Sequence, residues 1–222
     1  MDSAVIFDVD GVLLDLTPAE EEGFFVPFAR RYGLTGLSRD WDSYGTRNDE
    51  DIIAEILEVN GLPLSDRDAV IADYLGVMAE GFRAGRFSPV EIGGARALLQ
   101  SLHGRHAIGI ATANLLAAAR LRLVHAGLWQ WVEGYAFGAE GGGHKRETVA
   151  RAIAATGLPR SRIVYIGDNL NDVVAGLENG VHFIGFAVDA ARRHRLSAAG
   201  AEHTSGDHAA TRDMIARLLS KD

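Results

Sequence analysis

Two aspartates, Asp8 and Asp10, stand two residues apart at the end of the apolar run AVIF, where a buried strand is expected to finish. A single acid at such a place is most often a turn former or a helix cap. A pair of carboxylates can also do chemistry, because carboxylates transfer protons, attack electrophilic centres and supply the oxygen ligands that a hard cation such as Mg²⁺ prefers. The polar residues that follow the other apolar runs decide between these interpretations.

Four more polar residues occupy comparable positions. Thr112 ends the run AIGIAT, Lys145 lies in the connection after YAFG, and Asp168 and Asp172 follow RIVYI. In an open α/β sheet, the carboxyl ends of the strands converge on one crevice, where ligands bind. We therefore expect these four side chains to meet the aspartate pair in one site.

The elements that would position these residues are strands alternating with helices. Short apolar runs at residues 4–8, 106–112, 134–138, 162–168 and 182–188 are separated by segments with helical periodicity. This alternation is typical of a parallel sheet covered by helices. The pattern predicts an α/β fold with five strands in an open, doubly wound parallel sheet.

The segment from residue 15 to residue 87 differs, because strand-like runs are absent and helical patterns dominate. Thr17, Pro18 and Glu20 predict a helix start with a capping box, and Pro27 is expected to kink or break that helix. Two further helical patterns follow at residues 48–61 and 65–82. We therefore predict a core domain of residues 1–14 and 88–222 and an inserted helical cap domain of residues 15–87.

Composition excludes several classes of protein. The chain has 222 residues, a formal charge of −8 and no basic cluster, which argues against nucleic acid as a partner. It has no cysteine, so disulfides, thiol nucleophiles and cysteine zinc sites are excluded. The chain has no apolar run of about 18 residues, and we expect no signal segment, because the first residues lead directly into a strand. We expect a cytoplasmic protein that is a monomer or homodimer and does not bind membranes.

Four short segments, in this order, resemble the motifs of the haloacid dehalogenase-like hydrolase superfamily. They are DVDGVLLD, IATAN, the lysine of GHKRE, and GDNLND. With the cap position, the resemblance covers nearly the whole chain and is closest to the α-helical cap subgroup of phosphoglycolate phosphatase and β-phosphoglucomutase-like proteins. One departure is that Arg146 and Thr148 replace the prolines that usually follow the motif lysine, although the only other lysine is Lys221.

The resemblance implies a Mg²⁺-dependent phosphatase that hydrolyses a small phosphorylated metabolite through an aspartyl-phosphate. Asp8 would be the nucleophile and a metal ligand, and Asp10 the general acid and base, with its backbone carbonyl on the metal. Asp168 would be the third protein ligand. Such a site needs positive charge, because the nucleophile and the phosphate are both anions.

The same resemblance implies roles for the remaining motif residues. The Thr112 hydroxyl, the backbone N–H of Ala113 and the Lys145 ammonium would hold the phosphoryl oxygens. Asp172, with help from Asn169, would orient waters or the lysine from behind the metal ligands. In the cap, Arg47 is the one cation of the segment SYGTRNDEDII, and it either binds a second anionic group of the substrate or is an exposed arginine paired with Asp49 or Asp51.

Four other functions share part of this set of residues. A dehalogenase lacks the second acid of the first motif and needs no metal, so Asp10 and Asp168 argue against it. A phosphonate hydrolase needs a cap lysine, and residues 15–87 contain none. A phosphosugar mutase shares every core residue and stays open. A phospho-accepting signalling module also carries an aspartate at a strand end, but it gives no reason for the long helical insertion.

Overall fold

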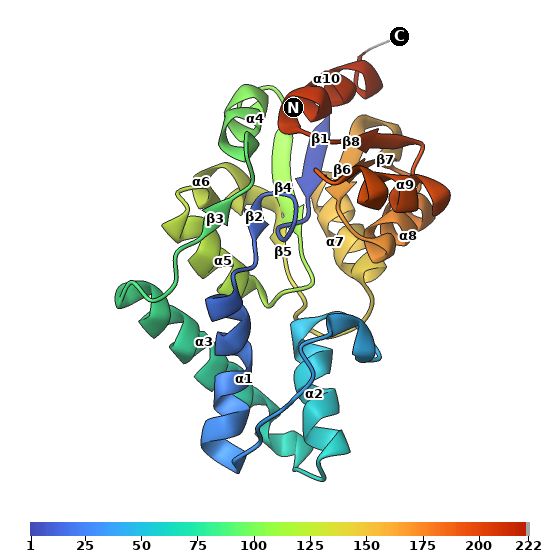
Figure 1. Ribbon diagram of the computed structural model, residues 1–222. Coiled ribbons are helices and arrows are strands. Elements are labelled where there is room, and N and C mark those ends of the chain that lie inside the picture. Colours follow the sequence, from blue (N-terminus) through green and yellow to red (C-terminus); the bar gives the residue numbers. More distant parts are fainter. Residues whose placement is uncertain (221–222) are drawn as a thin grey trace.

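A six-stranded parallel sheet forms the centre of the computed structural model, which describes residues 1–220, so that Lys221 lies outside the described residues (Figure 1). In spatial order its strands are β5 (Ala136–Phe137), β4 (Ala107–Ala111), β1 (Ala4–Phe7), β6 (Ile163–Gly167), β7 (His182–Phe186) and β8 (His203–Ser205). Neighbouring strands are all parallel. The predicted α/β class is confirmed and the five predicted strands are present, but the prediction missed β8.

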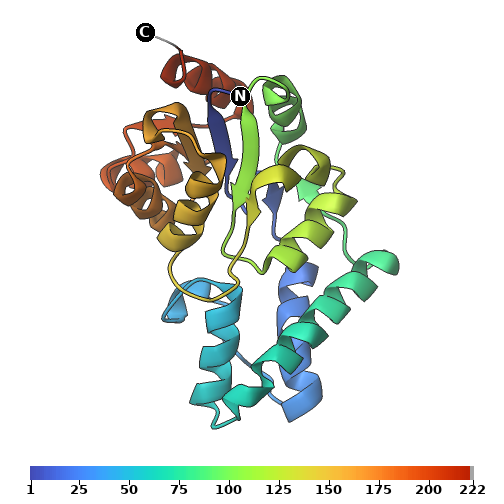
Figure 2. The same cartoon turned by 180° about the vertical axis from the view of Figure 1, so that it is seen from behind.

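The sheet is covered by helices on both faces. Successive residues of a strand point to opposite sides, and both sides are apolar, so both must be buried. On β1, Val5 and Phe7 belong to one apolar layer, and Ala4 and Ile6 belong to the other. The first layer packs under α4 (Ala95–Leu102), α5 (Leu116–His125), α6 (Trp129–Val132) and α10 (His208–Leu218). The second packs under α7 (Lys145–Thr156), α8 (Leu170–Asn179) and α9 (Ala190–Ala198). Figures 1 and 2 show α4, α5 and α6 on one side of the strands and α7, α8 and α9 on the other.

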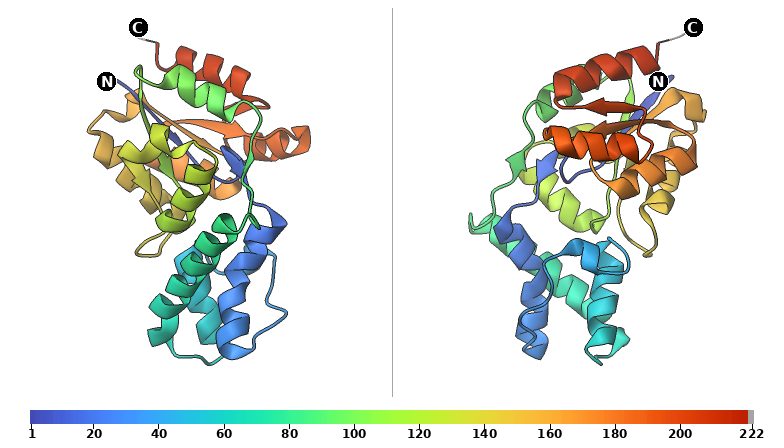
Figure 3. Two further views of the ribbon diagram at one scale, coloured as in Figure 1. Left: turned by 90° about the vertical axis from the view of Figure 1, so that its left-hand side faces the viewer. Right: turned by 45° about the vertical axis from the view of Figure 1, so that its right-hand side comes forward.

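Three long helices stand apart from the sheet, beyond its carboxyl edge (Figure 3). They are α1 (Pro18–Tyr32), α2 (Asp49–Val59) and α3 (Arg67–Arg83). They share an apolar core of their own, in which Phe28, Ile53 and Met78 are buried, and that core also takes in Leu115 and Ala118 from the start of α5. The chain leaves for these helices through β2 (Leu14–Asp15) and returns through β3 (Val90–Glu91), and these two strands pair with each other in antiparallel fashion.

The first of these helices begins as the sequence predicts. The Glu20 backbone N–H donates to the Thr17 hydroxyl at 3.3 Å, and the Thr17 backbone N–H donates to the Glu20 carboxylate at 3.0 Å. The helix does not break at Pro27, because α1 continues past it to Tyr32. The side chain of Pro27 is buried, although a proline within a helix lacks the N–H that would close one backbone hydrogen bond.

Short 3₁₀ helices complete the described elements. They cover Trp41–Ser43, Leu64–Asp66, Glu133–Tyr135 and Arg160–Arg162. Within residues 1–220, no helix combines the length and the apolar composition needed to cross a membrane.

Replacing Gly109 by alanine should destabilise the protein, because a Cβ on this β4 residue would overlap the backbone carbonyl oxygen of Tyr135. We expect a loss of about 1–3 kcal/mol in the free energy of unfolding, measured by equilibrium urea denaturation. Gly76→Ala is the matched control, because a Cβ there meets open space on α3 and should stabilise the helix by up to about 1 kcal/mol. Equal stability of Gly109→Ala and the wild type would contradict the packing described for β4.

Candidate active site

The predicted site residues gather where three neighbouring strands end. Asp8, Thr112 and Asp168 directly follow β1, β4 and β6, which lie side by side in the sheet. A cavity of about 410 Å³ lies between this edge and the cap helices. The predicted residues that line it are Asp8, Asp10, Arg47, Thr112, Ala113, Lys145, Asp168 and Asn169. Asp172 is fully buried behind the cavity wall.

A buried lysine connects two of the aspartates. The Lys145 ammonium lies 2.8 Å from Asp8 Oδ1 and 3.2 Å from Asp172 Oδ1. Burial disfavours the charged ammonium, but Asp172 and Asp8 outweigh this and raise the pKa of Lys145 above its ordinary value. The lysine therefore stays protonated at the floor of the cavity, beside the Asp8 carboxylate.

Asp172 has all of its acceptor positions engaged. Its Oδ1 accepts from the Tyr165 hydroxyl at 2.6 Å in addition to the lysine, and its Oδ2 accepts from the backbone N–H groups of Asp168 and Asn169 at 3.2 and 3.0 Å. Asn169 and Asp172 together form the capping box of α8. Asp172 therefore fixes the loop that carries Asp168 and orients Lys145, while Tyr165 is a partner that the sequence interpretation did not identify.

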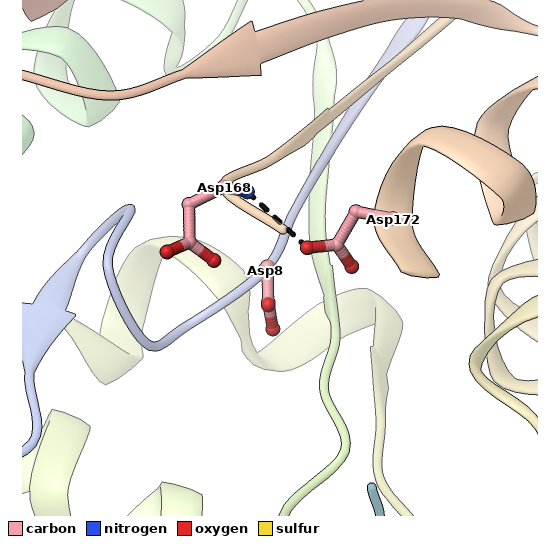
Figure 4. A group of neighbouring side chains, drawn as sticks. All are labelled: Asp8, Asp168 and Asp172. Atoms are coloured by element: carbon pink, nitrogen blue, oxygen red, sulfur yellow. Dashed lines mark hydrogen bonds between the residues drawn. The ribbon is translucent and has the colours of Figure 1, made fainter. Parts of the chain in front are cut away.

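The residues fit a hard divalent cation. Asp8, Asp168 and Asp172 each place a carboxylate oxygen within 4.8 Å of the other two, and Figure 4 shows these three side chains converging. Burial raises the pKa of Asp8, against the effect of Lys145, and raises the pKa of Asp168 to about 6. A cation would offset this concentrated negative charge, and oxygen donors suit Mg²⁺. Because Asp172 is saturated by protein donors, Asp8 and Asp168 are the better ligands.

Gly11 keeps room beside these acids. It adopts a φ of 70°, in the left-handed region that favours glycine, and a Cβ there would overlap the Asp168 carboxylate. The chain can therefore turn sharply beneath the carboxylates only with glycine at this position.

Two arginines that the sequence interpretation missed pair with the predicted acids. Arg192, at the start of α9, lies 2.6 Å from Asp168 Oδ2 and lines the cavity. Arg122, within α5, lies 2.6 Å from Asp10 Oδ1. Arg192 follows the strand β7, so its place at a strand's carboxyl end was a usable signal, whereas Arg122 lies inside a helix and offered none.

The predicted phosphoryl-binding residues of the second motif lie together. The Thr112 hydroxyl accepts from the Asn114 backbone N–H at 3.1 Å and is 3.2 Å from the Asn114 side-chain oxygen. The Ala113 carbonyl accepts from the Asp49 backbone N–H at 3.0 Å, and Asp49 Oδ2 accepts from the Leu115 N–H at 2.8 Å. The second motif therefore both lines the cavity and docks the start of α2.

The cap segment around Arg47 is docked on the core by hydrogen bonds. Asn48 Nδ2 donates to the Gly143 carbonyl at 2.7 Å, and the Gly143 N–H donates to Asp51 Oδ2 at 3.0 Å. Arg47 lines the cavity and pairs with Asp42 at 3.1 Å, so its acidic partner is neither Asp49 nor Asp51. Residues of α1, α2 and α3 and the segment that carries Arg47 therefore form one wall of the cavity.

The stability of the protein should depend on pH through Asp49, which is 7% exposed. Burial raises the pKa of its carboxyl to about 7, against an unfolded value near 3.9. A raised folded pKa stabilises the protonated fold, and this contribution is lost as pH rises from about 4 through about 7. Asp49→Asn should match the wild type near pH 4 and exceed its free energy of unfolding by about 2–4 kcal/mol at pH 8. Urea titrations across this range test the expectation, and a pH-independent difference between the two proteins would contradict it.

Comparisons with known proteins agree with this geometry. A family model described as haloacid dehalogenase-like hydrolase matches residues 3–180. Comparison with curated protein sequences gave no significant match. Among solved structures, a predicted phosphatase from Clostridium acetobutylicum is similar with a TM-score of 0.73 and 18% identity, over 98% of this chain and 99% of that chain.

Two further solved structures have comparable similarity. The protein CbbY from Rhodobacter sphaeroides, in complex with phosphate, gives a TM-score of 0.73 and 20% identity, over 94% of this chain and 96% of that chain. A candidate β-phosphoglucomutase from Bacteroides vulgatus gives 0.72 and 18%, over 99% of this chain and 90% of that chain. At these identities the structural likeness shows the fold alone. Since the family model spans most of the chain, however, the protein belongs to the haloacid dehalogenase-like hydrolases, a family of enzymes.

Proposed function

We propose that this enzyme is a Mg²⁺-dependent phosphatase that hydrolyses a small phosphate monoester through an aspartyl-phosphate on Asp8. The observation that carries the proposal is the Asp8 carboxylate itself. It lies at the floor of a covered cavity, 2.8 Å from the buried Lys145 ammonium and beside Asp168. A carboxylate in this setting has the electrostatic support that attack on an anion requires.

In the first step, a carboxylate oxygen of Asp8 attacks phosphorus, and the bond from phosphorus to the ester oxygen breaks. Among residues 1–220, Asp8 Oδ1 accepts from the Val9 N–H at 2.7 Å and contacts Lys145, while Oδ2 has no protein donor. These contacts fix the carboxylate and leave one oxygen for the attack. Lys145, the Thr112 hydroxyl and the Ala113 N–H would hold the phosphoryl oxygens.

Asp10 would move the protons. Its carboxyl group gives a proton to the leaving alkoxide oxygen, and the resulting carboxylate then takes a proton from water as the water oxygen attacks phosphorus. The bond from phosphorus to Asp8 breaks in this second step, which releases inorganic phosphate and restores the nucleophile. Asp10 lines the same cavity as Asp8, as this dual role requires.

The metal would be held by Asp8, Asp168 and the Asp10 backbone carbonyl. When bound, Mg²⁺ supplies positive charge that reduces the repulsion between the phosphate and the carboxylates. Asp172 and Asn169 would keep the Asp168 loop in place through the capping box of α8.

The substrate would be a small phosphorylated metabolite, in keeping with a covered cavity of about 410 Å³. The cap would act as a lid that hinges near residues 14–17 and 86–89, next to the paired strands β2 and β3. Its docking contacts, made by Asn48, Asp49 and Asp51, close the cavity over the phosphate site. Closure places Arg47 where it can bind a second anionic group of the substrate.

A phosphosugar mutase is the alternative function, because it uses the same core residues. One structural neighbour is described as a candidate β-phosphoglucomutase. The two activities differ in the fate of the phosphoryl group, which a phosphatase gives to water and a mutase returns to the sugar. Following both inorganic phosphate and the isomeric sugar phosphate in one incubation therefore separates them.

Asp8→Asn should lose nearly all phosphate release while keeping its fold, because an amide is a poor nucleophile and a weaker metal ligand. The measurement is phosphate release from a panel of phosphorylated acids, sugars and nucleotides with Mg²⁺, alongside circular dichroism of the variant. The wild type should also lose activity in excess chelator and regain it when Mg²⁺ is restored. Full activity of Asp8→Asn, or of the chelated wild type, would contradict the proposal.

Arg47→Ala should lower kcat/KM about 10-fold or more for a substrate with a second anionic group, and far less for p-nitrophenyl phosphate. The aryl ester offers no second anion for the guanidinium to bind. Arg39→Ala is a suitable control, because Arg39 pairs with Glu22 on the exposed side of the cap and does not line the cavity. Equal losses on both substrates would show that Arg47 has a structural role only.

A further inference from the structure

Arg122 is the largest side chain that is almost completely buried, with 2% of its surface exposed. It lies in the middle of α5 and uses a different nitrogen for each of three segments. Its Nη1 donates to Asp10 Oδ1 at 2.6 Å, its Nε donates to Glu20 Oε1 at 3.1 Å, and its Nη2 donates to the Asp15 carbonyl at 3.0 Å. One guanidinium therefore joins the catalytic loop, the first cap helix and the strand that leads into the cap.

Burying the charged guanidinium of Arg122 costs free energy of desolvation, so its presence at this place needs an explanation. Burial of an ion pair often brings no net stability, because desolvation offsets the attraction between the charges. Here both Arg122 and Glu20 are almost fully buried. Burial disfavours the charged guanidinium, but Asp10 and Glu20 outweigh this and raise the pKa of Arg122, so it stays charged. Stability alone gives a weak reason for placing an arginine here.

The contact with Asp10 gives a better reason. Within residues 1–220, the Asp10 carboxylate has Arg122 as its one side-chain partner, and 31% of the Asp10 side chain is exposed to the cavity. Without this contact, the carboxylate would be free to rotate among its rotamers. Proton transfer to a leaving group and from water requires hydrogen-bond geometry, so a carboxyl group that rotates freely is a poor general acid and base.

The position of Arg122 is itself fixed by the cap. Glu20 Oε2 accepts from the Thr17 hydroxyl at 2.7 Å and from the Thr17 N–H, so the residue that completes the capping box of α1 also holds the guanidinium. The Asp15 carbonyl belongs to β2, at the junction of core and cap. Movement of α1 away from the core would break the contacts that aim Arg122 at Asp10.

We propose that Arg122 is a positioning residue that orients the Asp10 carboxyl group toward the leaving group. Glu20 and the Asp15 carbonyl hold Arg122 in this position when the cap is docked on the core. The inference rests on the proposed phosphatase function and assigns a residue that none of the four motifs contains. Arg122 acts through Asp10 and touches no substrate atom.

The leaving group provides a test that a purely structural role would not affect. Phenolate is a poorer leaving group than p-nitrophenolate, so phenyl phosphate depends more on proton donation by Asp10 than p-nitrophenyl phosphate does, while the two esters are similar in shape. Loss of Asp10 positioning should therefore reduce kcat/KM more for phenyl phosphate. It should also slow hydrolysis of the aspartyl-phosphate, because the same carboxylate activates water.

The experiment compares Arg122→Lys, the double variant Glu20→Gln with Arg122→Gln, and the control Arg120→Lys. The double variant removes both charges of the buried pair of Arg122 and Glu20, so it leaves no unpaired carboxylate at Glu20. It therefore provides a second test if Arg122→Lys fails to fold. Arg120 lies on the exposed side of the same helix, with its guanidinium 5.4 Å from the Trp129 ring centre. Each protein is assayed with both esters, and the phosphorylated fraction is measured after acid quenching.

For both Arg122 variants we expect kcat/KM to fall about 100-fold with phenyl phosphate and less than about 10-fold with p-nitrophenyl phosphate. With p-nitrophenyl phosphate, for which formation of the aspartyl-phosphate is less affected than its hydrolysis, the phosphorylated fraction at steady state should be larger. Arg120→Lys should match the wild type with both esters. Equal losses on the two esters in a folded variant would overturn the role of Arg122. Failure of the wild type to form any aspartyl-phosphate would overturn the proposed function as well, and the wild-type reactions alone reveal that case.

Discussion

The structure depends on pairing buried negative charge at the carboxyl edge of the sheet. Four aspartates gather there, and cations from three different helices lie within hydrogen-bonding distance of them. The pairs are Asp8 and Asp172 with Lys145, Asp10 with Arg122, and Asp168 with Arg192. Acids this close together repel one another and lose hydration, so each needs a fixed partner. The packing of α5, α7 and α9 on the sheet supplies those partners and thereby holds the acids in fixed positions at this edge of the sheet.

The cap is connected to this charge cluster in two distinct ways. Around the start of α2, Asn48, Asp49 and Asp51 make hydrogen bonds with the backbone of Gly143 and Leu115 in the core. At the start of α1, Glu20 contacts the buried Arg122 and through it Asp10. In the proposed mechanism, closing the cavity and orienting the proton donor are therefore consequences of one docked arrangement of the cap.

The sequence predicted the sheet and the convergence of motif residues because both follow from local patterns. Apolar runs identify strands, and parallel strands bring their ends together. The strand β8 was missed because its three residues, His203 to Ser205, are polar and lie at the sheet edge. Arg122 was missed because an arginine within a helix normally faces solvent, and its burial results from cap packing between distant segments. Contacts of that kind leave no pattern along a single sequence.

The most direct test of the account is to find where the phosphoryl group resides during turnover. The enzyme is mixed with Mg²⁺ and p-nitrophenyl phosphate, quenched in acid within milliseconds, digested and mapped by mass spectrometry. The account predicts one phosphoryl group, on Asp8, which appears before inorganic phosphate and disappears as the substrate is consumed. A phosphoryl group on any other residue, or phosphate release with no covalent intermediate on Asp8, would contradict it.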